Sequence, residues 1–259
     1  MKLLLIILLV PFYSFTNIIT ISRSSSLQLN NSCLMVKYKE FPSPLEDTFY
    51  LKSVIMELQK KWPANRMVNF VFHGHSVPAG YFQTPAINSF QSYPLLSVKR
   101  ITDSFSTAEI NCILTAIGGE NAEQGAKRFD STVLNYQPDV LYIDYALNDR
   151  NIGLERSKAA WQYMIEKGLA KKVKIVLLTP TPHMLEDIKS NEAPLEKYTS
   201  QILAMGKQYH IPVIDSYHIF KKLVTGGKNV NDCMAQSNHP NAPGLLLVAH
   251  EICKLLGLN

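Results

Sequence analysis

The feature that most constrains the fold is a repeated alternation of short apolar runs with helical patterns. The apolar runs lie within residues 68–72, 108–117, 138–143, 173–178 and 211–214. Helical spacing of apolar residues follows over residues 125–134, 154–170, 195–209 and 242–256. Strands that alternate with helices predict an α/β fold, in which a mainly parallel sheet carries helices on both faces as a three-layer sandwich.

Polar or glycine-rich segments come directly after these apolar runs. They include residues 73–76, 118–121, 146–149 and 215–216. In an open parallel sheet the carboxyl ends of the strands share one edge, and ligands bind there. We therefore expect the functional site at this edge.

The N-terminus resembles a targeting segment. Lys2 precedes an apolar run over residues 3–12, which is too short to cross a bilayer as a mature helix. This pattern predicts a signal peptide over about residues 1–25, with an uncleaved anchor as the alternative. We expect an N-terminal extension with one helix over residues 26–66 and a single domain over residues 67–259. The mature protein would then be secreted or periplasmic, without stable membrane insertion.

Composition excludes several classes of function. The 26 basic and 21 acidic residues are scattered, whereas a nucleic-acid partner would require a basic stripe. No glycine-rich dinucleotide or phosphate loop follows the first apolar run, so we expect no cofactor. Export would permit disulfides among the four cysteines, but the sequence leaves their pairing open. His73 and His75 have no evident third ligand, so we expect no metal.

Four short segments, in chain order, carry a more specific signal. They are Gly74-His75-Ser76, Gly118-Gly119-Glu120-Asn121, Leu147-Asn148-Asp149 and Asn238-His239-Pro240-Asn241. Together they resemble the motifs of the SGNH hydrolases, or GDSL-like esterases. The resemblance runs from about residue 69 onward and implies a flavodoxin-like, five-stranded sheet.

The resemblance also implies a role for each matched residue. Ser76 would be the nucleophile, and His239 the general base that takes its proton. The main-chain N–H of Gly119 and the side-chain amide of Asn148 would stabilise an oxyanion. His75 stands where the family usually has aspartate, and Ala146 where it usually has glycine.

The third member of the proposed triad departs from the family pattern. The family places aspartate three residues before the histidine, and Gln236 occupies that position. Gln236 could orient the imidazole as a neutral group, or Asp232 could reach the ring by another path. A main-chain carbonyl is a further candidate for the group that orients the ring. The remaining interpretation is that the protein is a weakened or inactive relative of the family.

Two residues near these motifs are candidates for contact with substrate. Tyr81 follows the nucleophile turn, although packing of a loop would explain it equally well. Asp149 is expected either to hold its loop or to bind polar groups of the substrate. The predicted function is a serine esterase that hydrolyses carboxylic esters through an acyl-enzyme. The resemblance implies acetylated carbohydrates, short-chain esters or lysophospholipids as substrates, and we prefer the first because an exported single domain fits deacetylation of polysaccharide. The alternative is a protein of the same fold that binds a glycan without hydrolysing it. The sequence predicts no oligomeric state.

Overall fold

The computed structural model of the chain describes residues 49–258. Its centre is a five-stranded parallel sheet with the strand order β2-β1-β3-β4-β5. The strands are β1 (Met67–Gly74), β2 (Glu109–Leu114), β3 (Val140–Asp144), β4 (Lys174–Leu178) and β5 (Val213–Ile214). This order is that of a flavodoxin-like sheet, and the predicted α/β sandwich is confirmed.

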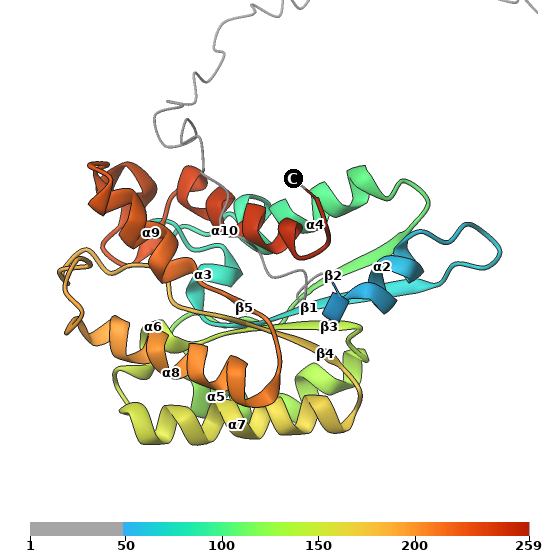
Figure 1. Cartoon of the computed structure of the whole chain (residues 1–259), viewed down its shortest axis with the longest axis horizontal. Coiled ribbons are helices and arrows are strands. Elements are labelled where there is room, and N and C mark those ends of the chain that lie inside the picture. Colours follow the sequence, from blue (N-terminus) through green and yellow to red (C-terminus); the bar gives the residue numbers. More distant parts are fainter. Residues whose placement is uncertain (1–48, 259) are drawn as a thin grey trace, which may run out of the picture. The chain divides into compact units, whose positions relative to one another are not determined.

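Helices cover both faces of the sheet, as Figure 1 shows. On one face lie α4 (Tyr93–Ser104), α9 (Ser216–Thr225) and α10 (Ala242–Lys254). On the other lie α5 (Ala122–Lys127), α7 (Leu154–Ala170) and α8 (Pro194–Tyr209). Successive strand residues point to opposite faces, so each face has its own apolar core. Burial on both sides explains why the strands are apolar throughout.

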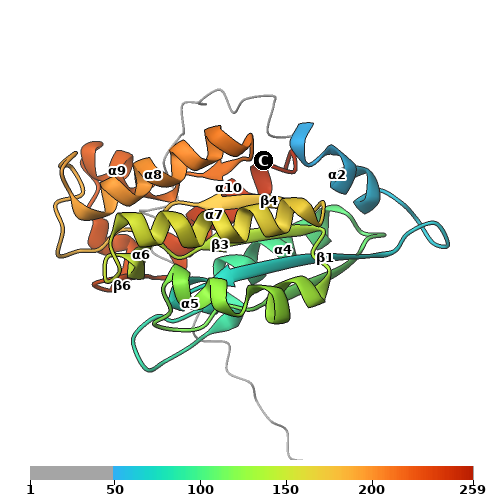
Figure 2. The same ribbon diagram turned by 90° about the horizontal axis from the view of Figure 1, so that it is seen from below.

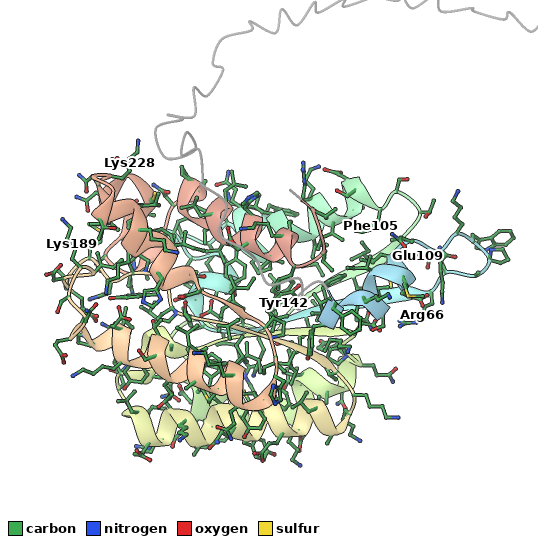
Figure 3. All side chains as sticks on the ribbon, in the orientation of Figure 1. Arg66, Phe105, Glu109, Tyr142, Lys189 and Lys228 are labelled. Carbon is green, nitrogen blue, oxygen red and sulfur yellow. The ribbon has the colours of Figure 1, made fainter. Side chains whose placement is uncertain are left out.

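A pair of stacked aromatic rings joins the neighbouring strands β1 and β3. The rings of Phe72 and Tyr142 are stacked with centroids 4.5 Å apart and planes 6° from parallel. Both side chains are fully buried, and Tyr142 is labelled in the middle of the fold in Figure 3. Such aromatic pairs contribute about 0.5–1.5 kcal/mol beyond the apolar area they bury. This contact anchors the strands whose ends carry the candidate site.

Most predicted elements are present, with small shifts at their ends. The helix predicted over residues 154–170 is α7, and the one over residues 195–209 is α8 with one more residue at its start. The helix predicted over residues 125–134 is wrong in its bounds. Helix α5 begins at Ala122, where the Asn121 side chain caps it, and ends at Lys127. A π-helical turn over Phe129–Val133 then continues the chain.

Three further features were not predicted from the sequence. Helices α4 and α9 have no counterpart among the predicted elements. A two-stranded antiparallel hairpin, formed by β6 (Met234–Gln236) and β7 (His239–Pro240), lies outside the main sheet. The hairpin matters most for function because His239 begins its second strand.

The short helices α3 (Ser76–Ala79) and α6 (Ala146–Asp149) begin just past the carboxyl ends of β1 and β3. Figure 2 shows α6 and β6 at the same end of the fold. The strand ends therefore bring Ser76, Asn148 and the hairpin with His239 to one edge of the sheet, as the sequence predicts.

The N-terminal predictions fall mostly on residues that the structure does not describe. The signal peptide, its cleavage site and the start of the extension all lie outside residues 49–258. Helix α2 (Lys52–Leu58) is the helix expected in the extension, and Leu51 and Leu58 are fully buried in the same core as β1. Within the described part of the chain, no helix combines the length and apolarity needed to span a membrane.

Candidate active site

Ser76 and His239 meet at the carboxyl edge of the sheet, although 163 positions separate them in the sequence. The Oγ atom of Ser76 lies 2.8 Å from Nε2 of His239, which is a short, direct hydrogen bond. Both residues are buried, with 7% and 4% of their surface exposed. The pair therefore has the geometry in which an imidazole can take a proton from a hydroxyl.

The turn that presents Ser76 depends on Gly74 and His75. A Cβ at Gly74 would lie 2.4 Å from the main-chain oxygen of Asp144, so only glycine allows β1 and β3 to approach so closely there. His75 caps α3, because its Nδ1 accepts a hydrogen bond from the Val77 main-chain N–H at 3.2 Å. Ser76 then begins the helix, and its main-chain N–H has no main-chain acceptor among the described residues.

The second ring nitrogen of His239 has a main-chain partner. Its Nδ1 lies 3.2 Å from the main-chain oxygen of Phe82, to which it donates because Nε2 faces the Ser76 hydroxyl. The Gln236 amide is engaged elsewhere, with the Thr84 main-chain N–H at 2.9 Å and Asn238 Oδ1 at 2.9 Å. The prediction that the Gln236 side chain orients the ring is therefore corrected.

The prediction that Asp232 reaches the ring of His239 is corrected in the same way. It is exposed in the 3-10 turn Val230–Cys233, and its main-chain oxygen accepts a hydrogen bond from the Asn241 side chain. No hydrogen bond or ion pair joins its carboxylate to His239 within residues 49–258. Of the candidates raised by the sequence, the main-chain carbonyl is the one in contact with the ring.

Gly119 lies in an open loop after β2. Its φ of +82° is a conformation that residues with a Cβ rarely adopt, and a Cβ there would have no heavy atom within 4 Å. Its main-chain N–H makes no main-chain hydrogen bond among the described residues. The peptide N–H is thus available to a ligand in a position that only glycine adopts without strain.

Asn148 is connected to this loop. Its Nδ2 donates to the main-chain oxygen of Glu120 at 2.9 Å, which uses one of the two amide protons. The second proton has no acceptor among the described residues. The half-buried side chain of Asn148 therefore lies against the Gly119 loop with one donor free.

A polar cluster behind the loop holds Glu120 in place. Its carboxylate accepts hydrogen bonds from Arg128 Nε at 2.9 Å and from the Tyr145 hydroxyl at 3.1 Å. Arg128 also donates to the main-chain oxygen of Thr115, at the end of β2. A charge-assisted network of this kind keeps the backbone between Gly119 and Asn121 from moving freely.

Asp149 does not face the site. Its carboxylate is fully buried and accepts hydrogen bonds from the Ala122 main-chain N–H at 2.7 Å, Ser157 Oγ at 2.7 Å and Trp161 Nε1 at 2.8 Å. The expectation that it binds substrate is corrected, because no polar group of a substrate could reach it. Asp149 instead joins α6 to α5 and α7, and so holds the loop that carries Asn148.

Tyr81 forms a wall of the site. Its ring centroid lies 5.9 Å from that of His239, and a Cβ on Gly118 would come within 2.8 Å of the Tyr81 ring. The ring therefore lies between the glycine loop and the histidine, half-buried. This position is compatible with substrate contact, which remains a prediction.

The two histidines at the end of β1 have separate partners. His73 is buried against Thr115 Oγ1 at 3.0 Å and the Tyr145 hydroxyl at 3.1 Å. Burial and the nearby Arg128 lower the pKa of His73 to about 3, so the ring is neutral. His75 instead contacts Asp144. No group of three or more potential metal ligands occurs among the described residues.

Burial also affects the pKa of the proposed general base, His239. It lowers the pKa of His239 below the ordinary 6.5, against the opposite effect of the Phe82 carbonyl. The imidazole is therefore neutral near pH 7, the state in which it can accept a proton.

A search of protein-family models identifies this architecture. Residues 72–245 match the GDSL-like lipase/acylhydrolase family, and this region contains all four motifs. The chain belongs to the GDSL-like lipase/acylhydrolase family. No curated protein matched the chain in sequence.

Solved structures resemble this GDSL-like chain in fold. A two-domain esterase active on acetylated mannans has a TM-score of 0.66 at 19% identity, and the match covers 81% of this chain. It covers 52% of that esterase, so the chain spans about half of its length. A lipase/acylhydrolase from Enterococcus faecalis has a TM-score of 0.58 at 24% identity, over 73% of this chain and 94% of that one. An acetylxylan esterase from Geobacillus stearothermophilus, solved as a catalytic mutant, has a TM-score of 0.63 at 15% identity, over 74% and 95%.

The sequence suggested a main-chain carbonyl as the partner of His239 but did not indicate Phe82, and it missed the contact between His75 and Asp144. The Phe82 carbonyl carries no side-chain signal, so no motif could reveal it. The contact between His75 and Asp144 links the ends of two strands that are neighbours only in the folded sheet. The replacement of aspartate by His75 was the one signal that pointed toward it.

Proposed function

We propose that this GDSL-like protein is a serine esterase that hydrolyses carboxylic esters through an acyl-enzyme. The observation that carries the proposal is the 2.8 Å hydrogen bond between Ser76 Oγ and His239 Nε2. Neutral His239 takes the Ser76 proton as Oγ attacks the ester carbonyl, and returns it to the leaving alcohol when the tetrahedral intermediate collapses. Water then attacks the acyl-enzyme with His239 again acting as base.

The oxyanion is stabilised by donors that the loops leave free. They are the main-chain N–H groups of Ser76 and Gly119 and the second amide proton of Asn148. Each such donor contributes about 2.7–4 kcal/mol to transition-state stabilisation in enzymes of this kind. Because the Glu120 network and Asp149 hold these loops in advance, little reorganisation is needed when charge develops.

The proposed substrates are esters of carbohydrates, acetylated polysaccharide above all. The support is indirect, since two of the similar structures are described as an esterase active on acetylated mannans and an acetylxylan esterase. Export is proposed from the N-terminal sequence pattern. The disulfide formed by Cys233 supports it, because disulfides persist mainly in oxidising compartments. Fractionation of the native host, with detection of the mature chain outside the cytoplasm, tests this part.

The decisive test measures hydrolysis of p-nitrophenyl acetate and release of acetate from acetylated xylan and mannan. Wild type should be active and Ser76→Ala inactive, and a fluorophosphonate probe should label only wild type. Hydrolysis retained by a folded Ser76→Ala variant would contradict the assignment of the nucleophile. A folded wild type that binds glycans but is neither labelled nor active would establish the non-catalytic alternative.

A further inference from the structure

Behind Ser76 lies a pair of buried polar side chains that the proposed mechanism does not use. His75 is fully buried and Asp144 is 2% exposed. Nε2 of His75 and Oδ1 of Asp144 are 3.2 Å apart, which is an ion-pair distance without hydrogen-bond geometry, and neither atom has a hydrogen-bond partner among the described residues. The other carboxylate oxygen of Asp144 accepts a hydrogen bond from the Tyr93 hydroxyl at 3.0 Å.

The hydrogen bonds of His75 determine where its proton lies. The Val77 main-chain N–H donates to Nδ1, so this atom carries a lone pair. A ring proton is therefore on Nε2, the ring atom within 3.2 Å of Asp144. Ser76 Oγ lies 3.5 Å from the same Nδ1, which is too far for a strong hydrogen bond, whereas His239 is 2.8 Å away. His75 thus orients the turn and leaves the proton of the nucleophile to His239.

Asp144 is the last residue of β3 and pairs with Gly74 of β1 in the sheet. Its carboxylate is therefore one strand away from the nucleophile turn. A buried carboxylate charge whose hydrogen-bond donor is a neutral hydroxyl is poorly screened, so its field extends further than that of a surface carboxylate. Burial and the Asp144 charge hold the pKa of Tyr93 well above its usual value, so the hydroxyl remains a donor.

We propose that Asp144, linked through His75, is a positioning residue whose buried negative charge replaces the carboxylate that is missing beside His239. It stabilises the imidazolium that forms at His239 and, through His75, holds the turn that presents Ser76. The inference rests on the proposed function and extends it. It also explains why a histidine stands at position 75, because a carboxylate there would lie against that of Asp144.

No other group near His239 supplies the negative charge that we assign to Asp144, among the residues that the structure describes. Around His239 the structure places His75, Ser76, the Phe82 carbonyl and the Tyr81 ring. Asp149 is also within electrostatic range of His75, but its carboxylate is bound by Ser157, Trp161 and the main chain of α5. Asp144 is the carboxylate in contact with the ring of His75.

The test is Asp144→Asn, with the pKa of His239 followed by NMR of its imidazole. Asparagine keeps the shape and can still accept from the Tyr93 hydroxyl, so the variant should fold. Loss of a nearby negative charge should lower the pKa of His239 by about one unit. The rate of labelling of Ser76 by a fluorophosphonate should fall about tenfold, since one pKa unit corresponds to a factor of ten. In turnover, kcat should fall with KM unchanged.

Asp139→Asn is the matched control. Asp139 lies just before β3, at the opposite end of the same strand, where it pairs with Arg66. Its neutralisation should leave the pKa of His239 unchanged. His75→Asn keeps an acceptor for Val77 but cannot reach Asp144, so its effect on labelling should be non-additive with that of Asp144→Asn.

The outcomes separate this inference from the proposed function. An unchanged pKa of His239 in folded Asp144→Asn, or additive effects in the double variant, would overturn the role of Asp144. Wild type that is never labelled would instead remove the esterase assignment. The NMR titration still tests the influence of Asp144 on His239 in that case.

Discussion

The Nδ1 atom of His239 lies 3.2 Å from the main-chain oxygen of Phe82. A carbonyl dipole therefore holds the ring where a carboxylate would hold it in a complete triad. The segment that carries this oxygen is braced by the hairpin, since Gln236 Oε1 accepts from the Thr84 main-chain N–H and Gln83 Nε2 donates to the Ala235 main-chain oxygen. Gln236 thus acts on the base through the backbone rather than by contact.

This arrangement predicts different results for the two residues that the sequence suggested as orienters. Gln236→Ala should lower kcat/KM by about threefold to tenfold, because one or two neutral hydrogen bonds that brace the Phe82 segment are lost. Asp232→Ala should leave kcat/KM within a factor of two, since its carboxylate is exposed and away from the ring. Initial rates with p-nitrophenyl acetate measure both. A larger loss in Asp232→Ala than in Gln236→Ala would contradict the observed partner of His239.

The pH dependence of activity follows from the state of His239. Burial lowers its pKa below 6.5, so the ring stays neutral, and competent as a base, to lower pH than a free histidine. Activity should be lost as pH falls through this lowered pKa, and the acidic limb of the kcat/KM profile should have its midpoint below 6.5. A midpoint above 6.5 in the wild type would show that another group, or a charged neighbour, controls the base.

The parts of the site that the sequence could predict are those tied to strand ends. Ser76 and Asn148 follow apolar strands directly, and parallel strands bring their carboxyl ends together whatever the details of packing. His239 was identified by its His-Pro-Asn context, although the hairpin that positions it was not. For these residues, local pattern and topology point to the same place.

The remaining features depend on contacts between distant segments. The Gln236 side chain does not orient His239 because it contacts Thr84 instead, 152 positions earlier in the chain. The role of Asp149 could not be chosen from sequence, because Ser157 and Trp161 reach its carboxylate only once α7 has packed against α6. Helix α4 was missed although Tyr93, at its start, is fully buried against Asp144. Such side-chain pairings leave no periodic signal.

Gly119 and Gly153 provide a matched pair for testing the glycine loop. Both have φ of +82°, both are exposed, and a Cβ on either would meet no heavy atom within 4 Å. Substitution by alanine should therefore destabilise each variant by about 1–2 kcal/mol, from backbone strain alone. Only Gly119→Ala should also lower kcat, because its peptide N–H is the proposed oxyanion donor. Urea unfolding and steady-state kinetics separate the two effects, and equal losses of kcat would contradict the assignment.

Asn148 and Asn121 offer a second comparison at the same edge of the sheet. Asn148→Ala should lower kcat by about 100- to 1,000-fold with little change in KM, because the amide proton that is free in the resting site bonds the oxyanion in the transition state. Asn121→Ala removes the cap of α5, where the side chain accepts from the Gln124 main-chain N–H at 3.1 Å. That loss should cost about 1 kcal/mol of stability but leave most of the activity. If Asn121→Ala reduced kcat as severely as Asn148→Ala while both proteins remained folded, general loosening of the Gly119–Asn121 loop would explain the effect, and Asn148 would lose its assigned place in the oxyanion site.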